Sequence, residues 1–496
     1  MIPEEVARRE RLNALRHADI NPYPAESKRT HMIADVLLHF SELEKTDEKL
    51  VVCGRVRSLR KHGGLTFLTI EDESGKMQVA IKRDVVGTEN YLFFHNHIDI
   101  GDFLEINGSV FVTQRGEQSL NTERWTLLAK TILPLPEKWH GLTDTEKRYR
   151  YRYLDLLSNP LVVNRARIRS QIVRSMRSFL ESEGFLEVET PILQPIAGGA
   201  SARPFVTHHN TLHHDFYLRI APELYLKRLI VGGFEKIYEF ARCFRNEGIS
   251  PQHNPEFTQI ELYWAYATIE DLMEHLERML QKIVEEVLPS NSVELDNKTI
   301  TFNFPIPRFS FHDLIETETG IDLNQIKDEE ALRKTMKDKN IDVEDIVGYA
   351  ELVDHLWKLE ARPKVIQPTF VIDYPASMKP LAKRREDDHY SASAQLVIDG
   401  MEVWNAFNEQ NDPIEQEEIF EEQESLRERG SEDAQQIDHD FLKALKHGMP
   451  PTAGYGIGID RLVAILTGAN NLKEVILFPT LKPIPYEEDS DDVRDV

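Results

Sequence analysis

The segment FTQIELYWAY, residues 257–266, carries side chains whose types and spacing suit the binding of a charged ligand. Its alternating pattern predicts a β-strand with one apolar and one polar face, because successive side chains of a strand point to opposite sides. The polar face would hold Phe257, Gln259, Glu261 and Tyr263. A carboxylate among aromatic neighbours is costly to bury unless a cation pairs with it. For Gln259 alone, an ordinary half-exposed sheet position is the simpler interpretation.

Two other segments place acids in similar surroundings. The segment VWNAFNE repeats the arrangement and puts Asn405, Phe407 and Glu409 in phase. In RIAPELYLKRL, Glu223 follows a proline at the start of a helical pattern. Together with Glu261, these acids would be explained by a pocket for an ammonium ligand.

Two arginines suit a different ligand. Arg245 lies in CFRNEG and Arg461 in GIGIDR. Guanidinium groups bind phosphate oxygens bidentately and stay charged, although either arginine alone would more often be a surface ion-pair partner. GYGIGIDR matches the GxGxxG pattern only loosely and is a weak indication of a nucleotide. Its expected place at a strand-to-helix junction allows close packing or the approach of a phosphate.

The elements that must position these residues fall into two regions. A short helix is expected over 4–17, before the breaker-rich Asn21-Pro22-Tyr23-Pro24. From about 51 to 135 the apolar pattern has period two, which predicts a small closed barrel of short strands, with an OB-fold as one option. From 161 an amphipathic helix runs to Gly184. Beyond it, helices are expected over 268–288, 310–360 and 413–447, and strands up to about 267, near 369–374 and over 394–409.

Composition limits the class of protein. No apolar run approaches the roughly 20 residues of a membrane span, and the N-terminus lacks an apolar signal region. Cys53 and Cys243 are far apart in sequence, which argues against a disulfide framework. Six histidines have no convincing metal-ligand spacing: His17, His62, His208, His209, His213 and His214. We expect a cytoplasmic chain without a membrane partner.

The net charge of −25 argues against a nucleic-acid partner, because Lys and Arg carry phosphate binding. The average hides a basic stretch, however. Residues 147–177 contain nine Lys and Arg residues against the single acid Asp155. A nucleic-acid contact and a solvated helix face both remain possible there. The acids gather over 415–433 and 487–495, where solvated faces are the favoured interpretation.

Several motifs resemble those of a known enzyme family. GFLEVETP (184–191), FRNEG with HNPEF (within 244–257) and GIGIDR (456–461) resemble motifs 1, 2 and 3 of class II aminoacyl-tRNA synthetases. Four further segments resemble the lysyl-tRNA synthetase branch of subclass IIb: GGASARPF (198–205), IAPELYLKRL (220–229), NPEFTQIELYWAYA (254–267) and NAFNEQND (405–412). The resemblance covers nearly the whole chain, as far as Pro483.

This resemblance implies an α+β architecture in which an N-terminal β-barrel (OB-fold) precedes a large antiparallel-sheet catalytic domain flanked by helices. The expected segments are a helical extension (1–50), an anticodon-binding OB-fold (51–135), a basic connector (136–160), the catalytic domain (161–484) and an acidic tail (485–496). Motif 1 helices build the dimer interface in class II enzymes, so a homodimer is also implied. The implied partners are tRNA(Lys), lysine and ATP.

The implied reaction is the ATP-dependent activation of lysine to lysyl-adenylate, followed by transfer of lysine to the 3′ end of the tRNA. Because an in-line attack depends on positioning and charge neutralisation, no general acid–base pair is expected. The arginines Arg245 and Arg461 take the catalytic role. The implied lysine site consists of Gly199, Glu223, Arg245, Glu261, Tyr263, Asn405, Phe407 and Glu409. The implied ATP site consists of Arg245, Asn246, Glu247, His253, Asn254, Phe257, Gln395, Leu396, Gly458, Ile459, Asp460 and Arg461.

One position departs from the family pattern. The resemblance implies that Glu402 binds Mg²⁺. The family has a glutamate as a second Mg²⁺ ligand seven residues before Glu402, where this chain has Gln395. An amide oxygen ligates Mg²⁺ without supplying charge. The departure therefore concerns the number or affinity of metal ions and not the reaction.

The barrel is expected to contact the anticodon. Phe67 lies where the family stacks an anticodon base, and Arg57, Glu71 and Gln78 are candidates for contacting base edges. A buried core position for Phe67 is an equally good interpretation.

Three alternatives fit parts of the sequence. An aspartyl- or asparaginyl-tRNA synthetase has the same architecture, but an acidic substrate should recruit Arg or Lys where this chain offers acids. A ligase that attaches lysine to a protein would share the catalytic domain but does not explain the barrel. A regulatory binding module without catalysis is disfavoured because both arginines are present.

The metal and lysine assignments together make a geometric prediction. Asp399-Gly400 predicts a two-residue hairpin turn that pairs Ile398 with Met401 and Val397 with Glu402. Strict alternation would then send Glu402 and Asn405 to opposite faces of the strand. Both side chains reach one cavity only if the strand is irregular between them. We therefore predict a β-bulge around Val403-Trp404.

Overall fold

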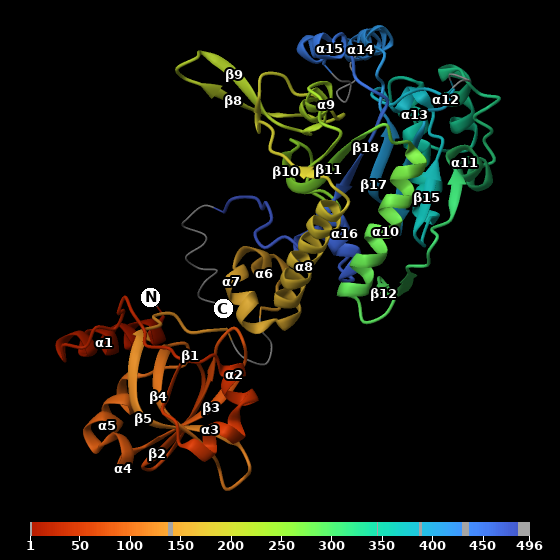
Figure 1. Cartoon of the computed structure of the whole chain (residues 1–496). Coiled ribbons are helices and arrows are strands. Elements are labelled where there is room, and N and C mark those ends of the chain that lie inside the picture. Colours follow the sequence, from red (N-terminus) through yellow and green to blue (C-terminus); the bar gives the residue numbers. More distant parts are fainter. Residues whose placement is uncertain (1, 137–141, 345, 386–388, 429–435, 485–496) are drawn as a thin grey trace. The chain divides into compact units, whose positions relative to one another are not determined.

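The chain divides into two compact units in a computed structural model (Figure 1). One unit comprises Met1–Thr143 with Pro483–Val496, and the other comprises Asp144–Lys482. The structure describes residues 2–136, 142–344, 346–385, 389–428 and 436–484. The expected acidic tail, 485–496, lies outside the described residues.

The first unit is built around a closed five-stranded barrel with strand order β1-β2-β3-β5-β4. The strands are β1 (Leu50–His62), β2 (Leu65–Glu71), β3 (Lys76–Lys82), β4 (Phe103–Val112) and β5 (Gln118–Ala129). Apolar side chains alternate along the strands and point into the barrel, where Leu68, Ile70 and Val79 are fully or almost fully buried in one core. The barrel predicted from the period-two pattern is confirmed.

Helices surround this barrel more than the pattern suggested. The N-terminal helix α1 (Pro3–His17) matches the expected one closely. Two short helices, α2 (Ile33–Leu38) and α3 (Phe40–Thr46), lie within residues 1–50, where a helical extension was expected. Two more were not expected: α4 (Arg83–Val86) and α5 (Thr88–His97). Helix α5 inserts Tyr91 and Phe94 into the barrel core. Helices this short carry too few turns for a periodic signal.

The second unit contains an eight-stranded sheet with the order β14-β15-β16-β17-β18-β11-β10-β6. Its strands are β6 (Leu186–Glu187), β10 (Lys236–Phe244), β11 (Glu256–Ala265), β14 (Arg308–Ser310), β15 (Thr369–Ile372), β16 (Ser393–Ile398), β17 (Met401–Asn408) and β18 (Thr452–Gly458). The expected antiparallel sheet needs one correction. Its edge pairs, β6 with β10 and β14 with β15, are parallel.

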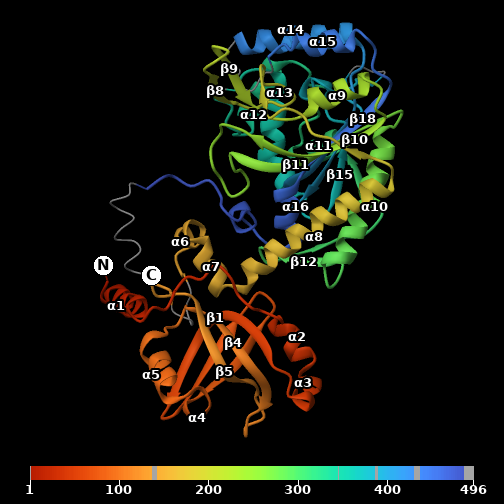
Figure 2. The same ribbon diagram turned by 60° about the vertical axis from the view of Figure 1, so that its left-hand side comes forward.

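Three helices cover one face of this sheet, as Figure 2 shows. They are α8 (Pro160–Ser182), α10 (Ile269–Val287) and α16 (Ile459–Leu466). A capping box between Thr268 and Asp271 starts α10. The apolar sides of these helices form one core with Ile260, Leu262 and Trp404 of the sheet. Polar residues of the same strands therefore face away from the helices.

The remaining elements of the second unit lie outside this sheet and its three covering helices. The helices are α6 (Thr145–Arg150), α7 (Arg152–Ser158), α9 (Glu223–Val231), α11 (Phe311–Thr319), α12 (Glu329–Asp338), α13 (Tyr349–Leu356), α14 (Pro413–Glu428) and α15 (His439–Leu445). The short strands are β7 (Leu193–Gln194), β8 (Phe205–His209), β9 (His214–Leu218), β12 (Ser292–Leu295) and β13 (Lys298–Thr301). The helices expected over 310–360 are present as α11, α12 and α13, which a Gly320 cap and later turns separate.

The predicted bulge in β17 is confirmed. Asp399 and Gly400 both have positive φ, which suits a two-residue hairpin turn. Val397 pairs with Glu402, whereas Leu396 pairs with Trp404, so Val403 is the extra residue. The register shift brings both Glu402 and Asn405 to Gln395.

No helix in the described part of the chain is long and apolar enough to cross a membrane.

Candidate active site

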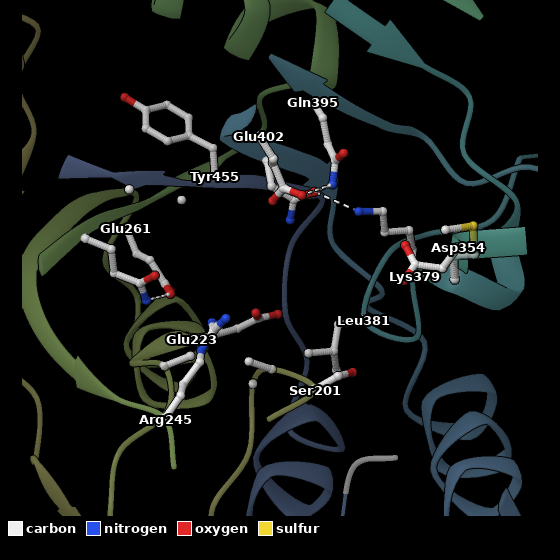
Figure 3. Close-up of a pocket in the computed structure, with 18 of the residues that line it drawn as sticks. Ser201, Glu223, Arg245, Glu261, Asp354, Lys379, Leu381, Gln395, Glu402 and Tyr455 are labelled. Carbon is white, nitrogen blue, oxygen red and sulfur yellow. Dashed lines mark hydrogen bonds between the residues drawn. The ribbon is translucent and has the colours of Figure 1, made fainter. Parts of the chain in front are cut away.

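A cavity of about 500 Å³ opens in the second unit. Residues from β11, β17, β18, α9 and the loop at Gly199 line it. Figure 3 shows two groups of polar residues in its wall. Glu223, Arg245 and Glu261 form one group, and Gln395, Glu402 and Lys379 belong to the other.

The polar face of β11 projects into the cavity as predicted. Phe257, Gln259, Glu261 and Tyr263 all line it, while Ile260 lies in the core behind the sheet. Glu261 accepts hydrogen bonds from Gln259 Nε2 at 2.6 Å and from the Tyr263 hydroxyl at 3.2 Å. The simpler interpretation of Gln259 as an ordinary sheet residue is wrong, because its amide orients a buried carboxylate.

Burial sets the electrostatics of Glu261. Loss of solvent raises its pKa well above the usual value, and the neighbouring Glu223 raises it further. The Tyr263 hydrogen bond acts in the opposite direction. A carboxyl group in this position gains most from a ligand that brings a positive charge.

Glu223 and Glu409 both contact a buried lysine, Lys227. Lys227 Nζ lies 2.6 Å from Glu223 Oε1 and also contacts Glu409 Oε2. Burial lowers the pKa of Lys227, but Glu223 and Glu409 outweigh it and the net shift is upward. Burial raises the pKa of Glu409 to about 8, although Lys227 opposes this shift. The Lys227 ammonium also lies 5.5 Å from the centre of the Phe407 ring.

Lys227 is a site residue that the sequence analysis missed. Its signal was the i, i+4 spacing from Glu223, which places both side chains on one side of α9. Glu409 Oε1 has no hydrogen-bond partner within the described ranges. A buried acceptor without a partner is expensive, so the geometry favours a ligand donor beside Glu409.

Two glycines make room for this cluster. Gly199 has φ of +85°, and a Cβ there would lie 3.0 Å from Glu223 Cβ. A Cβ at Gly454 of β18 would overlap the side chains of Glu409 and Tyr263. Gly454 was also missed, because its requirement comes from the pairing of β18 with β11 and not from its own segment.

Arginines and an aromatic ring form the other end of the cavity. The Arg245 guanidinium lies 5.0 Å from the centre of the Phe257 ring. Arg461 donates to the Glu402 carbonyl at 2.9 Å, and its second amino group lies 3.3 Å from His253 Nε2. Burial, together with Arg461 and Arg245, lowers the pKa of His253 to about 4. Neutral His253 and two guanidinium groups create a positive region suited to an anion.

The second polar group links β16 and β17. Gln395 Nε2 donates to Glu402 Oε2 at 2.8 Å and to Asn405 Oδ1 at 3.2 Å. Lys379 Nζ donates to the same Asn405 oxygen at 2.8 Å. One carboxylate, Glu402, suits a single Mg²⁺, since this ion keeps several waters and takes its other ligands from substrate phosphates.

Most of the expected lysine and ATP residues line this one cavity, and three do not. Leu396 and Ile459 are buried in the core under the helices, so only their backbone can face a nucleotide. The backbone N–H of Asn246 donates to the Arg203 carbonyl, and Asn246 is not among the lining residues.

Two further expected nucleotide residues have structural partners. Asp460 accepts from the Thr258 amide at 2.9 Å and pairs with Arg169 at 2.6 Å. Asn254 donates to the Glu256 carbonyl and accepts from the Thr480 amide. Both residues line the cavity but are engaged by the protein. Glu247 and Gly458 line it as well.

The expected base-contacting residues lie together on the barrel. Inward residues of β2 alternate with Phe67, so Phe67 lies on the outer face and not in the barrel core. Glu71 pairs with Arg57 at 2.7 Å, and Gln78 donates to Ser119 at 2.9 Å. The interpretation of Phe67 as a buried core residue is therefore wrong.

The histidines that the structure describes do not gather into a metal site. His208 pairs with Asp215 at 2.7 Å on the β8–β9 hairpin. Among the described residues, no group of three or more His, Cys, Asp and Glu side chains is arranged to hold a metal ion.

Comparison with known proteins places the chain in a family. Residues 144–482 match the family model of class II tRNA synthetases (D, K and N), and residues 50–128 match that of the OB-fold nucleic acid binding domain. A protein of Carboxydothermus hydrogenoformans named lysine--tRNA ligase is 46% identical over 96% of this chain and 97% of its own length. Proteins with the same name from Roseiflexus castenholzii (48% identity, 95% of this chain and 97% of that protein) and Thermosipho africanus (45%, 97% and 97%) are similar over nearly their full lengths.

A matched catalytic model over most of the chain, a matched OB-fold model over the barrel and full-length relatives agree with the geometry of the cavity. The chain belongs to the class II tRNA synthetase family, in its D, K and N group.

Proposed function

We propose that the chain is a lysine--tRNA ligase that activates lysine with ATP and transfers it to the 3′ end of tRNA(Lys). The observation that carries the proposal is the charge of the amino-acid end of the cavity. Three carboxylates, Glu223, Glu261 and Glu409, face two cations, Lys227 and Arg245. When all three are ionised, the state that a bound ammonium group favours, one negative charge is left, and lysine carries one net positive charge at neutral pH.

This balance discriminates against the acidic and neutral substrates of the same family group. Aspartate would add a negative charge to a buried region that already holds one in excess. Asparagine would leave Glu409 Oε1 without a charged donor. The alternatives of aspartyl and asparaginyl transfer therefore fit the cavity poorly.

The proposed lysine pose follows from the positions of the acids. Glu223 and the backbone at Gly199 receive the α-amino group. Arg245 and Asn405 hold the carboxylate. Glu261, Tyr263, Phe407 and Glu409 surround the ε-ammonium group. Since Gln259 fixes Glu261 and Lys227 fixes Glu409, the carboxylates are oriented before the substrate arrives.

The nucleotide occupies the arginine end of the cavity. Arg245 and Arg461 bind phosphate oxygens, with Arg461 oriented by the Glu402 carbonyl. The adenine ring stacks on Phe257, and Glu247, His253, Asn254, Gly458 and Asp460 complete this end. Mg²⁺, bound through Glu402 and the phosphates, would neutralise charge on the triphosphate.

The chemistry is a displacement at the α-phosphorus. An oxygen of the lysine carboxylate forms a bond to phosphorus, and the bond to the bridging oxygen of pyrophosphate breaks with its electron pair leaving on pyrophosphate. Arg245 contacts both reactants in this pose and so aligns them. No side chain has to remove a proton, because the nucleophile is already ionised.

The proposed domain roles extend to the tRNA. Residues 51–135 bind the anticodon through the outer barrel face, after the helical extension 1–50, and residues 161–484 catalyse, joined through the basic segment 136–160. A homodimer is proposed through the motif 1 region, where Leu186, Ile192 and Leu193 are each more than two-fifths exposed. We also place the enzyme in the cytoplasm.

Amino-acid-dependent ATP–pyrophosphate exchange, measured across the twenty amino acids, tests the proposal. Lysine should support exchange far better than any other amino acid, and charging of tRNA(Lys) should follow in the complete reaction. Exchange with aspartate or asparagine, or exchange without charging of any tRNA, would overturn it.

A further inference from the structure

A lysine outside the expected site residues lies at the metal end of the cavity. Lys379 directly follows a single 3-10 turn, Ala376–Met378, and precedes Pro380. Its ammonium points toward Gln395 and Glu402, as Figure 3 shows. It donates to Asn405 Oδ1 at 2.8 Å and lies 4.7 Å from the centre of the Tyr374 ring. Proline on one side and a short turn on the other limit the positions open to this side chain.

The surroundings of Lys379 favour its charged form over what burial alone would allow. Burial lowers the pKa of Lys379, and the net shift is downward although Glu402 and Asp354 act in the opposite direction. The face of the Tyr374 ring adds a favourable contact for a cation. Lys379 thus lies in the wall where phosphate oxygens and the carboxylate of the amino acid are proposed to meet, and these anions favour its charged form.

The orientation of Gln395 is fixed by its neighbours. Glu402 can only accept hydrogen bonds, so the group that faces it must be the amino end of the Gln395 amide. The oxygen of Gln395 accepts from the buried Tyr374 hydroxyl at 2.5 Å. The side chain therefore presents N–H groups, and not an oxygen, to Glu402 and Asn405.

This arrangement does not fit a metal ion shared by residues 395 and 402. Sharing requires an oxygen from each side chain, but the Gln395 oxygen is held by Tyr374. One of the two Glu402 oxygens, Oε2, is already occupied by the Gln395 amide. Relative to a glutamate pair, Gln395 removes one negative charge, and Lys379 adds a positive charge nearby.

We propose that Lys379 is a built-in cation of the nucleotide site, and that Lys379 and Gln395 together take the place of one divalent ion that a glutamate at position 395 would help to bind. This inference rests on the proposed function. Lys379 also acts on the amino acid, because it occupies Asn405 Oδ1 and leaves the Asn405 amino group to meet the substrate carboxylate. Lys379 is in this sense a positioning residue as well as a charge.

The first test counts metal ions without using activity. Mn²⁺ bound to the full chain is measured by electron paramagnetic resonance in the presence of a non-hydrolysable ATP analogue. The double variant Gln395→Glu with Lys379→Met should bind one more Mn²⁺ per site than the unaltered chain. Equal numbers in the two proteins would overturn the proposal.

The second test separates the charge of Lys379 from its packing. In Lys379→Met, further Mg²⁺ has to supply the charge that the ammonium no longer gives, at a place where Gln395 offers no oxygen. The Mg²⁺ concentration for half-maximal pyrophosphate exchange should therefore rise roughly tenfold, the scale of one charge-assisted hydrogen bond. Lys379→Arg keeps the charge and should recover most of this loss. If Arg and Met at this position give the same Mg²⁺ dependence, the residue is structural and the proposal fails.

A matched control uses a second lysine of the cavity wall. Lys358 pairs with Asp354 at 2.5 Å and is about half exposed. Lys358→Met should leave the Mn²⁺ count unchanged, and a gain of one ion there would show that any loss of positive charge has the same effect, contrary to the proposal. Thermal melting of each variant establishes that it is folded before the ions are counted.

The two proposals fail in different ways. If lysine is not the selected amino acid, the exchange assay on the unaltered chain shows it, whatever the metal count. If lysine is selected but the double variant gains no Mn²⁺, only the proposal of a built-in cation is wrong and the proposed function stands.

Discussion

The ammonium of Lys227 contacts Glu409 from one helical turn beyond Glu223, so one buried cation connects α9 with the end of β17. Both carboxylates line the proposed lysine site. Their orientation is therefore set by the protein and not by the substrate. This relationship explains how three acids can face one cavity without being expelled by mutual repulsion.

Replacing Glu409 with glutamine should weaken the use of lysine with little effect on ATP. The change removes a charged acceptor for the ε-ammonium. The transition-state binding free energy derived from kcat/KM for lysine should therefore weaken by about 1.5–3 kcal/mol. Pyrophosphate exchange at varied lysine and varied ATP measures both effects. Glu417→Gln, on the surface helix α14, is the matched control. Unchanged lysine dependence in Glu409→Gln would contradict the assignment.

Removing the ammonium of Lys227 should destabilise the fold. Lys227→Met leaves Glu223 and Glu409 buried without their shared cation, a change that typically costs about 3–5 kcal/mol. Urea denaturation gives the free energy of unfolding. Part of the loss should return when Glu409→Gln is added, because the unpaired charge is then removed. The exposed Lys443 of α15 serves as control, and equal effects of Lys443→Met and Lys227→Met would refute the pairing.

The sequence predicted much of this site because its signals were local. Alternation in β11 gave the shared face of Glu261 and Tyr263, and the turn at Asp399-Gly400 gave the register of β16 and β17. The bulge at Val403 was predicted because Glu402 and Asn405, expected to bind metal and lysine, must both reach one cavity. Nothing in the local pattern marks the extra residue, so only this functional requirement predicted it.

The missed residues depend on contacts between distant segments. Lys379, Lys227 and Gly454 look ordinary in their own segments, and their roles arise from Asn405, Glu409 and Tyr263 respectively. Leu396 and Ile459 show the converse. They neighbour functional residues in sequence, but alternation and helix geometry turn their side chains into the core.

The pH dependence of lysine use should follow Glu409. Its pKa in the folded chain is about 8, raised by burial above the unfolded value. Protons are therefore bound more tightly in the folded chain, and the contribution of this group to stability declines as pH rises from about 4.5 to about 8. Lysine binding needs the carboxylate, so kcat/KM for lysine should increase toward pH 8.

Initial rates of exchange between pH 6.5 and about 9 test this expectation, with stability followed by urea denaturation at the same pH values. The Glu409→Gln variant supplies the comparison, since it lacks the titrating group and should show a flatter profile. An identical pH profile in both proteins would assign the titration to another group, including the α-amino group of lysine itself.

The outer face of the barrel should affect charging and not activation. Phe67 lies outside the barrel core, between the register positions of Arg60 on β1 and Ala80 on β3, where a flat base can stack on it. Phe67→Ala should reduce the affinity for tRNA by about 1–3 kcal/mol, the contribution of one base stacked on an aromatic ring. Pyrophosphate exchange without tRNA should stay unchanged.

Phe111→Ala is a suitable control, because Phe111 is a partly buried aromatic of β4 that contacts Lys82 and is not among the expected base contacts. Charging kinetics at varied tRNA concentration decide the matter: equal KM values for tRNA in Phe67→Ala and the unaltered chain would remove Phe67 from the anticodon site.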